Sequence, residues 1–239
     1  MASSQPPEPA ENGLTLYENP VCPFAQRVLI ALAEAGVEYK RVYIDLKNKP
    51  AWYPQINPLG QVPALRVEDA TIITESLIII EYIADRFADR AALMPRDPLL
   101  RARVRYLINF YDTRVNPISH QLLHATDPAE QKTLKLRIRE SLKGFNDLLA
   151  KQRQRNAEEG PYFLGKQFSL ADLAIAPQIA RLVAVAGHYR GFEIPRTAEY
   201  AELHRWYDAV RKRPSFKGSS EPDDTYIEGF RRFVPEFNK

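Results

Sequence analysis

Apolar and polar positions alternate in two ways over the first 90 residues of this 239-residue chain. Short runs with strand character take turns with stretches whose apolar residues recur at helical spacing. Two strands flank the first helix, which predicts a parallel pair joined by a crossover, whereas the last two strands flank a tight turn and predict an antiparallel hairpin. The predicted order is β-α-β-α-β-β-α, with strands at 14–17, 39–44, 63–67 and 71–73 and helices at 24–35, 52–56 and 75–87.

The pattern changes after residue 90. Prolines and charges predict a linker at 91–97, and beyond it only helical periodicity is found. Ser169-Leu-Ala-Asp172 has the form of a capping box, with Asp at its fourth position. The predicted helices cover 99–126, 128–156, 173–186, 199–213 and 226–233. We therefore expect a flexible leader at 1–12, an α/β domain at 13–90 and an all-helical domain at 98–239.

Composition narrows the class of protein. Hydrophobic residues make up 45% and charged residues 26% of the chain, as in globular domains, and the net charge of +3 is spread without the basic block typical of nucleic-acid binding. The longest apolar run, 28–33, is far too short to span a membrane. No Lys or Arg precedes Arg27, so a secretory signal is not expected. A single cysteine excludes an intramolecular disulfide, and dispersed histidines disfavour a metal site, so we expect a cytoplasmic, metal-free protein.

The single cysteine, Cys22, lies between a predicted strand and a predicted helix, and Pro23 suits the first helical turn. The helix dipole and free N–H groups at that position favour the thiolate, which attacks disulfides and thioethers. Because the chain has no second cysteine, an external thiol must resolve any mixed disulfide. The alternative is a small, buried, structural cysteine.

Two further segments suit a peptide-like ligand. Gly60-Gln-Val-Pro63 leads into a strand, where a cis Pro63 would present the Val62 backbone to an extended ligand. Thr74-Glu-Ser76 opens a helix whose N–H groups and Ser76 hydroxyl could hold a carboxylate. A trans proline at a strand start and simple N-capping are the respective alternatives.

In order and spacing, these features resemble the cytosolic glutathione transferases. Cys22-Pro-Phe-Ala25 followed by Gln-Arg is similar to the omega class and the related plant lambda class. Asn57-Pro-Leu-Gly-Gln-Val-Pro-Ala64, Glu75-Ser76 with Glu81-Tyr82, and Phe168-Ser-Leu-Ala-Asp172 match further motifs of that family. The resemblance covers about residues 14–215 and implies a thioredoxin-like N-terminal domain followed by an all-helical C-terminal domain.

The resemblance also implies roles for single residues. Cys22 would be the catalytic thiol, and glutathione would be bound by Phe24, Lys49, Val62, Pro63, Glu75 and Ser76. The implied reactions are thiol transfer, dehydroascorbate reduction and removal of glutathione from aryl-ketone adducts. A small hydrophobic or glutathionylated second substrate would lie between the domains. Its candidate contacts are Tyr111 and Arg114, with Tyr106, His120 and His124 as weaker candidates. Tyr17, the nearest hydroxyl before the cysteine, is expected to be structural.

Two other functions remain open. The chloride intracellular channel family shares the fold and a similar cysteine turn, but it has serine where this chain has Ala25, and Arg27 interrupts any membrane-length apolar stretch. A non-catalytic protein that binds aromatic ligands is the second alternative. Omega-like members are usually dimers and lambda-like members monomers, so we expect a homodimer and leave a monomer open.

Overall fold

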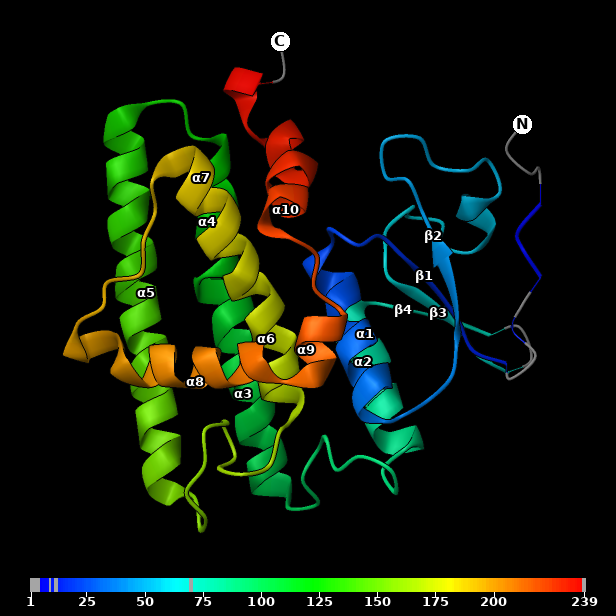
Figure 1. Cartoon of the computed structure of the whole chain (residues 1–239), viewed down its shortest axis with the longest axis horizontal. Helices are drawn as coiled ribbons and strands as arrows, with labels where there is room; N and C mark the ends of the chain where they lie inside the picture. Colours follow the sequence, from blue (N-terminus) through cyan, green and yellow to red (C-terminus); the bar gives the residue numbers. More distant parts are fainter. Residues whose placement is uncertain (1–4, 9, 11–12, 69–70, 238–239) are drawn as a thin grey trace.

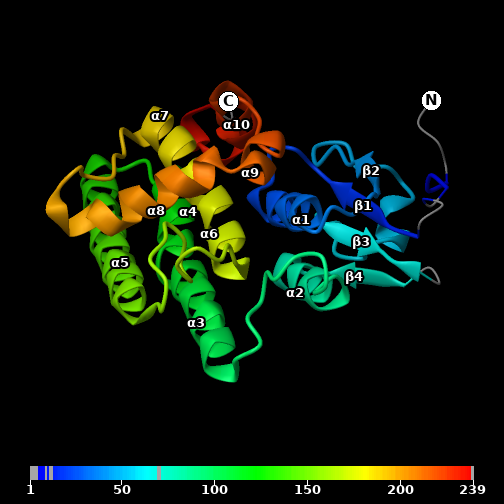
Figure 2. The same ribbon diagram turned by 60° about the horizontal axis from the view of Figure 1, so that its bottom comes forward.

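The computed structural model describes residues 5–8, 10, 13–68 and 71–237, so residues 1–4, 9, 11 and 12 of the predicted leader lie outside the described part. Figures 1 and 2 show two regions side by side. One contains the strands with the first two helices, and the other contains the remaining helices. The change of pattern near residue 90 therefore coincides with a change of architecture.

The sheet has four strands in the order β2-β1-β3-β4. Strand β1 pairs in parallel with β2, and β3 pairs antiparallel with β4, as the sequence predicts. Strand β1 also pairs antiparallel with β3, which joins the two predicted pairs into one sheet. The strands are β1 (Thr15–Glu18), β2 (Lys40–Tyr43), β3 (Ala64–Arg66) and β4 (Ile72–Thr74).

Neighbouring residues of β1 face opposite sides of the sheet, because side chains alternate along a strand. Leu16 packs in the main core with helices α1 (Pro23–Glu34) and α2 (Ser76–Arg86). Tyr17 packs on the other side, in a smaller cluster with Trp52 and Tyr53. The second predicted helix is a single 3₁₀ turn, η1 (Tyr53–Gln55). The order β-α-β-α-β-β-α is thus confirmed, with one helix reduced to a turn.

Among its described residues, the second region has helices joined by loops, and its only β pairing consists of two isolated bridges between residues 162 and 167. The predicted helix at 99–126 is two helices, because Pro117 lacks the N–H that would continue the hydrogen-bond ladder. The predicted helix at 173–186 starts earlier and ends in a wide π-helical turn. The elements are α3 (Pro98–Arg114), α4 (Asn116–His124), α5 (Pro128–Arg155), α6 (Leu170–Arg181), the wide turn η3 (Leu182–Ala186), α7 (Gly187–Arg190), η4 (Ala198–Tyr200), α8 (Ala201–Lys212), α9 (Pro214–Gly218), α10 (Asp223–Phe230), η5 (Arg231–Phe233) and η6 (Pro235–Phe237).

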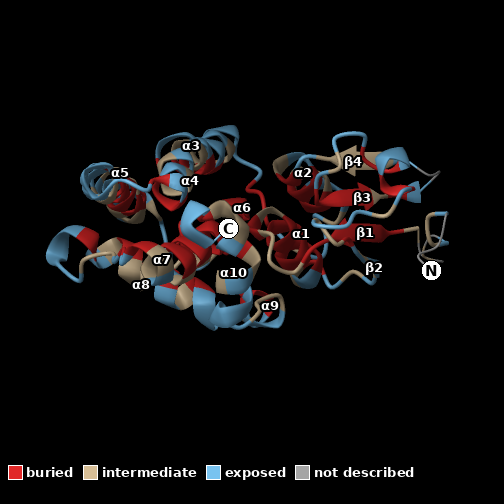
Figure 3. Cartoon of the chain, turned by 90° about the horizontal axis from the view of Figure 1, so that it is seen from above, coloured by how far each residue is buried: buried red, intermediate tan, exposed pale blue. Residues whose placement is uncertain are grey.

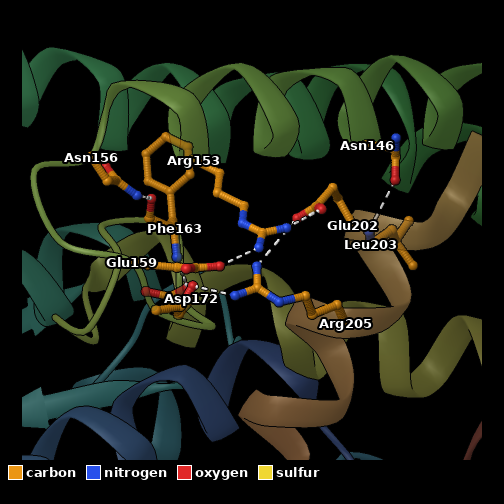
Figure 4. Close-up of polar contacts among 10 residues, drawn as sticks. Asn146, Arg153, Asn156, Glu159, Phe163, Asp172, Glu202, Leu203 and Arg205 are labelled. Atoms are coloured by element: carbon orange, nitrogen blue, oxygen red, sulfur yellow. Dashed lines mark hydrogen bonds and ion pairs between the residues drawn. The ribbon is translucent and has the colours of Figure 1, made fainter.

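Helix α6 forms the centre of the molecule, and Figure 3 shows it among buried residues between the two regions. The predicted capping box at its start is confirmed. One carboxylate oxygen of Asp172 accepts from the Ser169 N–H and hydroxyl, each at 2.8 Å. The other accepts from the Phe163 N–H at 2.9 Å and the Trp206 indole at 2.6 Å. Because Trp206 belongs to α8, these bonds join the start of α6 to a neighbouring helix. Figure 4 shows Asp172 and Phe163 together with the ion pairs that Arg153 forms with Glu159 and Glu202.

One stretch of the described residues, Leu170–Arg190, is long and apolar enough to cross a membrane by length and composition. Of its most apolar window, 83% is buried inside the protein. That burial is typical of the core helix of a globular fold.

Candidate active site

A cavity of about 500 Å³ opens at the N-terminal end of α1, between the two regions. The predicted catalytic residue and all the predicted glutathione-binding residues line it. They are Cys22, Phe24, Lys49, Val62, Pro63, Glu75 and Ser76. They come from four separate segments of the sheet region, so the fold brings together what the sequence places up to 54 positions apart.

Cys22 is the N-cap residue of α1, and its half-buried thiol lies 3.7 Å from the Val62 carbonyl oxygen. Burial raises the pKa of this thiol, because the charged thiolate would lose hydration. The Ala25 and Phe24 N–H groups and the charges of Arg181 and Arg27 act in the opposite direction. The helix start thus favours the thiolate, as expected, but desolvation has the larger effect on the pKa and was not part of that expectation.

The Val62–Pro63 peptide bond is cis, as the Gly60-Gln-Val-Pro63 segment predicts. The preceding carbonyl, that of Gln61, accepts hydrogen bonds from the Tyr53 hydroxyl at 2.7 Å and the Asn57 amide at 2.8 Å. These bonds hold the segment against η1 at the edge of the cavity.

Lys49 lies over Gly60 on the same edge of the cavity. A Cβ atom added at Gly60, which has a φ of +63°, would lie 3.1 Å from the Lys49 Nζ. The ammonium group is thus close to the backbone that leads to Val62, and its charge faces the same cavity.

Glu75 and Ser76 form the start of α2. Glu75 has a φ of +66°, a backbone conformation that costs a non-glycine residue roughly 1–3 kcal/mol and is found mainly at functional sites. Ser76 is buried, and its hydroxyl accepts a hydrogen bond from Arg27 at 3.2 Å. The free N–H groups at this helix start suit an anion.

Arg27 is fully buried beneath Ser76 and was missed as a site residue. Its guanidinium also donates to the Ala174 carbonyl at 2.7 Å and to both oxygens of Asp112, at 2.8 and 3.1 Å. It therefore joins α1, the start of α2, α3 and α6. The available signal was a charged residue on the buried face of a helical pattern.

The far wall of the cavity comes from the helical region. It consists of His120, Gly229, Phe230, Arg232 and Phe233. Gly229 packs so closely that an added Cβ would lie 2.8 Å from the Val21 side chain. Of the candidate contacts for the second substrate, only His120 is in this wall, and no sequence signal connected residues 229–233 with Cys22.

The structure contradicts Tyr111 as a contact of a second substrate. Its side chain is 1% exposed and packs edge to face on Phe145, with ring centroids 5.7 Å apart. Arg114 lines a different cavity of about 310 Å³, together with Tyr106 and Phe110. Both choices failed because α3 turns Tyr111 toward the core and Arg114 away from α1.

Tyr17 has the packing expected of a structural residue, with its ring against Trp52 and Tyr53. Its hydroxyl has no hydrogen-bond partner among the described residues. Within the same part of the chain, no three His, Cys, Asp or Glu side chains are grouped so that they could hold a metal ion.

Two family descriptions match the chain. The N-terminal domain of glutathione S-transferases matches residues 21–86, and the C-terminal domain of glutathione S-transferases matches residues 128–209. The first match contains Cys22 and the segments of Val62 and Ser76. The second contains the Ser169–Asp172 capping box.

Curated relatives carry related names. Glutathione S-transferase omega-1 of Sus scrofa is 30% identical over 89% of this chain and 83% of its own length. Glutathione S-transferase L3 of Arabidopsis thaliana is 33% identical over 97% of this chain and 92% of its own length. Probable glutathione S-transferase DHAR1, cytosolic, of Oryza sativa is 28% identical over 87% of this chain and 88% of its own length. Among solved structures, glutathione transferase Omega 3C of Trametes versicolor has a TM-score of 0.81 at 29% identity, covering 95% of this chain and 92% of its own.

Proposed function

The chain belongs to the glutathione S-transferase family, and from this we propose that it is an omega-like, glutathione-dependent thiol transferase and dehydroascorbate reductase with Cys22 as its nucleophile. The observation that carries the proposal is the position of Cys22. The only thiol of the chain lies at a helix start in a 500 Å³ cavity, beside the Val62 backbone and the start of α2.

Glutathione would extend along the sheet side of the cavity. Its γ-glutamyl carboxylate would bind at the start of α2, with Glu75 accepting from the α-amino group and Ser76 donating to the carboxylate. Its cysteinyl backbone would pair with Val62, and its glycine carboxylate would face Lys49. In this orientation the sulfur atom of glutathione would lie next to Cys22.

The reaction has two stages, formation of a Cys22–glutathione disulfide and its resolution. The Cys22 thiolate attacks the sulfur of a glutathionyl group, forms the disulfide, and expels the substrate as a thiolate or, for an aryl-ketone adduct, as an enolate that takes up a proton. With dehydroascorbate, the Cys22 thiolate adds to a carbonyl carbon, and a glutathione thiolate then attacks the Cys22 sulfur of this adduct, which forms the same disulfide and releases ascorbate. A second glutathione thiolate attacks the glutathionyl sulfur of this disulfide. Glutathione disulfide leaves, and the Cys22 thiolate is restored.

The burial of Cys22 is compatible with these reaction steps. Because burial raises the pKa of the thiol, the helix N–H groups and the charges of Arg27 and Arg181 are what counteract the cost of forming the thiolate. A bound glutathionyl substrate would also place the leaving sulfur within the same water-poor cavity. The second exchange needs an external thiol, because the chain has no other cysteine.

The test uses the single cysteine. After incubation with glutathione disulfide, intact-mass spectrometry should find one added glutathione per chain, and Cys22→Ser should show none. Wild type and Cys22→Ser are then compared in thiol transferase, dehydroascorbate reductase and aryl-halide conjugation assays. Loss of the first two activities in Cys22→Ser supports the proposal. Retention of those activities without an adduct on the wild type would refute it.

A second candidate function, storage of aromatic ligands without catalysis, is favoured by the rings of Phe24, Phe230 and Phe233 in the cavity wall. Displacement of a fluorescent dye by aromatic ligands separates the two functions. Binding that persists in Cys22→Ser while turnover disappears shows both to be present. Binding without turnover in the wild type leaves only storage.

We propose a homodimer located in the cytosol. The location is supported by the rice relative, whose name includes the word cytosolic. The dimer is supported by Ile78 and Tyr106, large apolar side chains that are exposed on α2 and α3. These helices are adjacent, because Arg105 of α3 pairs with Glu81 of α2. Sedimentation equilibrium measures the assembly state, and a monomer at micromolar concentration would contradict the dimer.

A further inference from the structure

A small second cavity of about 30 Å³ lies beside the active-site cavity. His120 and Phe230 line both cavities, so they form the shared wall. The rest of this niche comes from α4, the end of α6 and the wide turn Leu182–Ala186, against which α10 packs (Figure 1). We call it the α6 niche. Wide π-helical turns of this kind occur frequently at functional sites.

Gln178 contributes an unused hydrogen-bond donor to the α6 niche. Its side chain is 4% exposed, and its Nε2 has no hydrogen-bond partner among the described residues. Buried polar groups are nearly always paired, because an unpaired buried donor destabilises the fold. The Nε2 group is therefore available to an acceptor that enters the niche.

Arg181 adds positive charge to the same niche. It is 4% exposed, and its guanidinium donates to the Val21 carbonyl at 3.2 Å and to Gln26, while lying 3.7 Å from the ring centroid of Tyr226. No carboxylate of the described residues forms an ion pair with it. All its hydrogen-bond partners in the protein are neutral. Apart from the Cys22 thiolate, which its charge favours, the cation therefore lacks the carboxylate that buried charges ordinarily have.

The rest of the niche is partly polar and partly apolar. The Ser119 hydroxyl already donates to the Val115 carbonyl at 2.9 Å, Asn116 and His120 are the other polar lining residues, and Leu123, Leu182 and Val185 are apolar. The niche therefore presents an unused neutral donor and a cation next to an apolar wall. The niche has a volume of about 30 Å³, which leaves room for a small polar group but not for a further aromatic ring.

We propose that the second substrate is an aromatic compound with a carboxylate at the end remote from its glutathionyl sulfur, and that Gln178 and Arg181 bind this carboxylate in the α6 niche. The proposal rests on the proposed function, because it requires Cys22 to act on the other end. The aromatic ring would lie against Phe230, which lines both the cavity and the niche, in the cavity that Phe24 and Cys22 also line. Arg181 reaches the residue before Cys22, so the niche lies close to the nucleophile.

The test compares two adducts, S-(4-carboxyphenacyl)glutathione and S-(4-methylphenacyl)glutathione, by the ratio of their kcat/KM values. Comparing ratios between variants removes the difference in intrinsic reactivity of the two adducts. Gln178→Leu keeps the approximate volume but deletes the donor, and the ratio should fall about tenfold, as expected for a lost hydrogen bond to a charged group. The matched control is Gln152→Leu. Gln152 is equally buried, but its amide donates to Asn156 at 2.7 Å, far from the cavity, so the ratio should not change.

The outcomes distinguish failure of the inference about the niche from failure of the proposed function. A ratio that changes less than twofold in folded Gln178→Leu overturns the inference and assigns the niche to a structural water. If Gln178→Leu does not fold, product inhibition of the wild type decides instead. The ketone products of the two adducts are 4-acetylbenzoate and 4-methylacetophenone. The first, which carries the carboxylate, should inhibit at least about tenfold more strongly than the second, and equal inhibition overturns the inference. Failure of the wild type to turn over either adduct refutes the proposed function rather than the niche.

Discussion

Replacement of Arg27 by methionine should destabilise the fold far more than the same change at Arg105. Both arginines bind a carboxylate of α3 or α2 with two hydrogen bonds, and both pairs join the sheet region to the helical region. They differ in burial. Arg27 is 1% and Asp112 22% exposed, whereas Arg105 is 46% and Glu81 36% exposed. The two sites thus compare the same kind of arginine–carboxylate ion pair in a buried and in a solvent-exposed environment.

The magnitude follows from what each change leaves behind. Removing one partner of a buried ion pair typically costs about 3–5 kcal/mol, because the other charge remains desolvated. Asp112 keeps some contact with water, so we expect about 3 kcal/mol for Arg27→Met, including the lost donor to the Ala174 carbonyl. An exposed pair contributes about 0–1 kcal/mol, which is the loss expected for Arg105→Met.

Urea unfolding monitored by tryptophan fluorescence measures both losses. The chain has two tryptophans, Trp52 in the sheet region and Trp206 in α8, so the signal reports on both regions. Two separate transitions in Arg27→Met would show that the regions had become uncoupled. In the double variant Arg27→Met/Asp112→Leu, most of the lost stability should return, because no unpaired charge remains.

Equal losses at the two sites would refute the argument. They would mean that Arg27 is solvated in spite of its burial, or that the contact between α1 and α3 contributes little. A double variant as unstable as Arg27→Met would likewise show that the loss comes from packing and not from the charge of Asp112.

Three further predictions concern the site and the core. Ser76→Ala should raise the KM for glutathione about three- to tenfold, with a smaller effect on kcat, because one hydrogen bond to the ligand is lost; an unchanged KM contradicts the role of Ser76. Because burial raises the pKa of Cys22, its alkylation by iodoacetamide should accelerate with pH around a midpoint above that of free cysteine, about 8.5; a midpoint below that of free cysteine contradicts this. Asp172→Asn should cost about 3 kcal/mol in urea unfolding, since two of four donors lose their acceptor. The exposed helix cap Asp97→Asn should cost less than about 1 kcal/mol.

Apart from Lys49, which only the family resemblance implied, the sheet side of the site could be predicted from the sequence because its parts have local causes. A proline after Cys22 indicates a helix start, a Val-Pro pair before a strand suggests a cis bond, and Glu75-Ser76 opens the next helix. Such signals depend on neighbouring residues only. The alternation of periodicities then placed the segments in one small sheet.

The helical side of the site could not be predicted in this way. Gly229 and Phe230 approach Val21 and Cys22 through tertiary packing, and no periodicity within α10 shows which helix start it will cover. Tyr111 illustrates the same limit. Helical spacing shows that one face of α3 is apolar, but whether that face meets a substrate or the core depends on where α5 and α6 lie.

Because α10 supplies part of the cavity wall over Cys22, the exposure of the thiol differs between the growing chain and the folded protein. Phe230 follows Cys22 by about 200 residues, and at roughly 5–20 residues per second the ribosome needs about 10–40 s to make the segment between them. Throughout that interval the nascent thiol lacks one wall of its cavity. Oxidants and low-molecular-weight disulfides therefore have their freest access to Cys22 during translation, before the second wall exists.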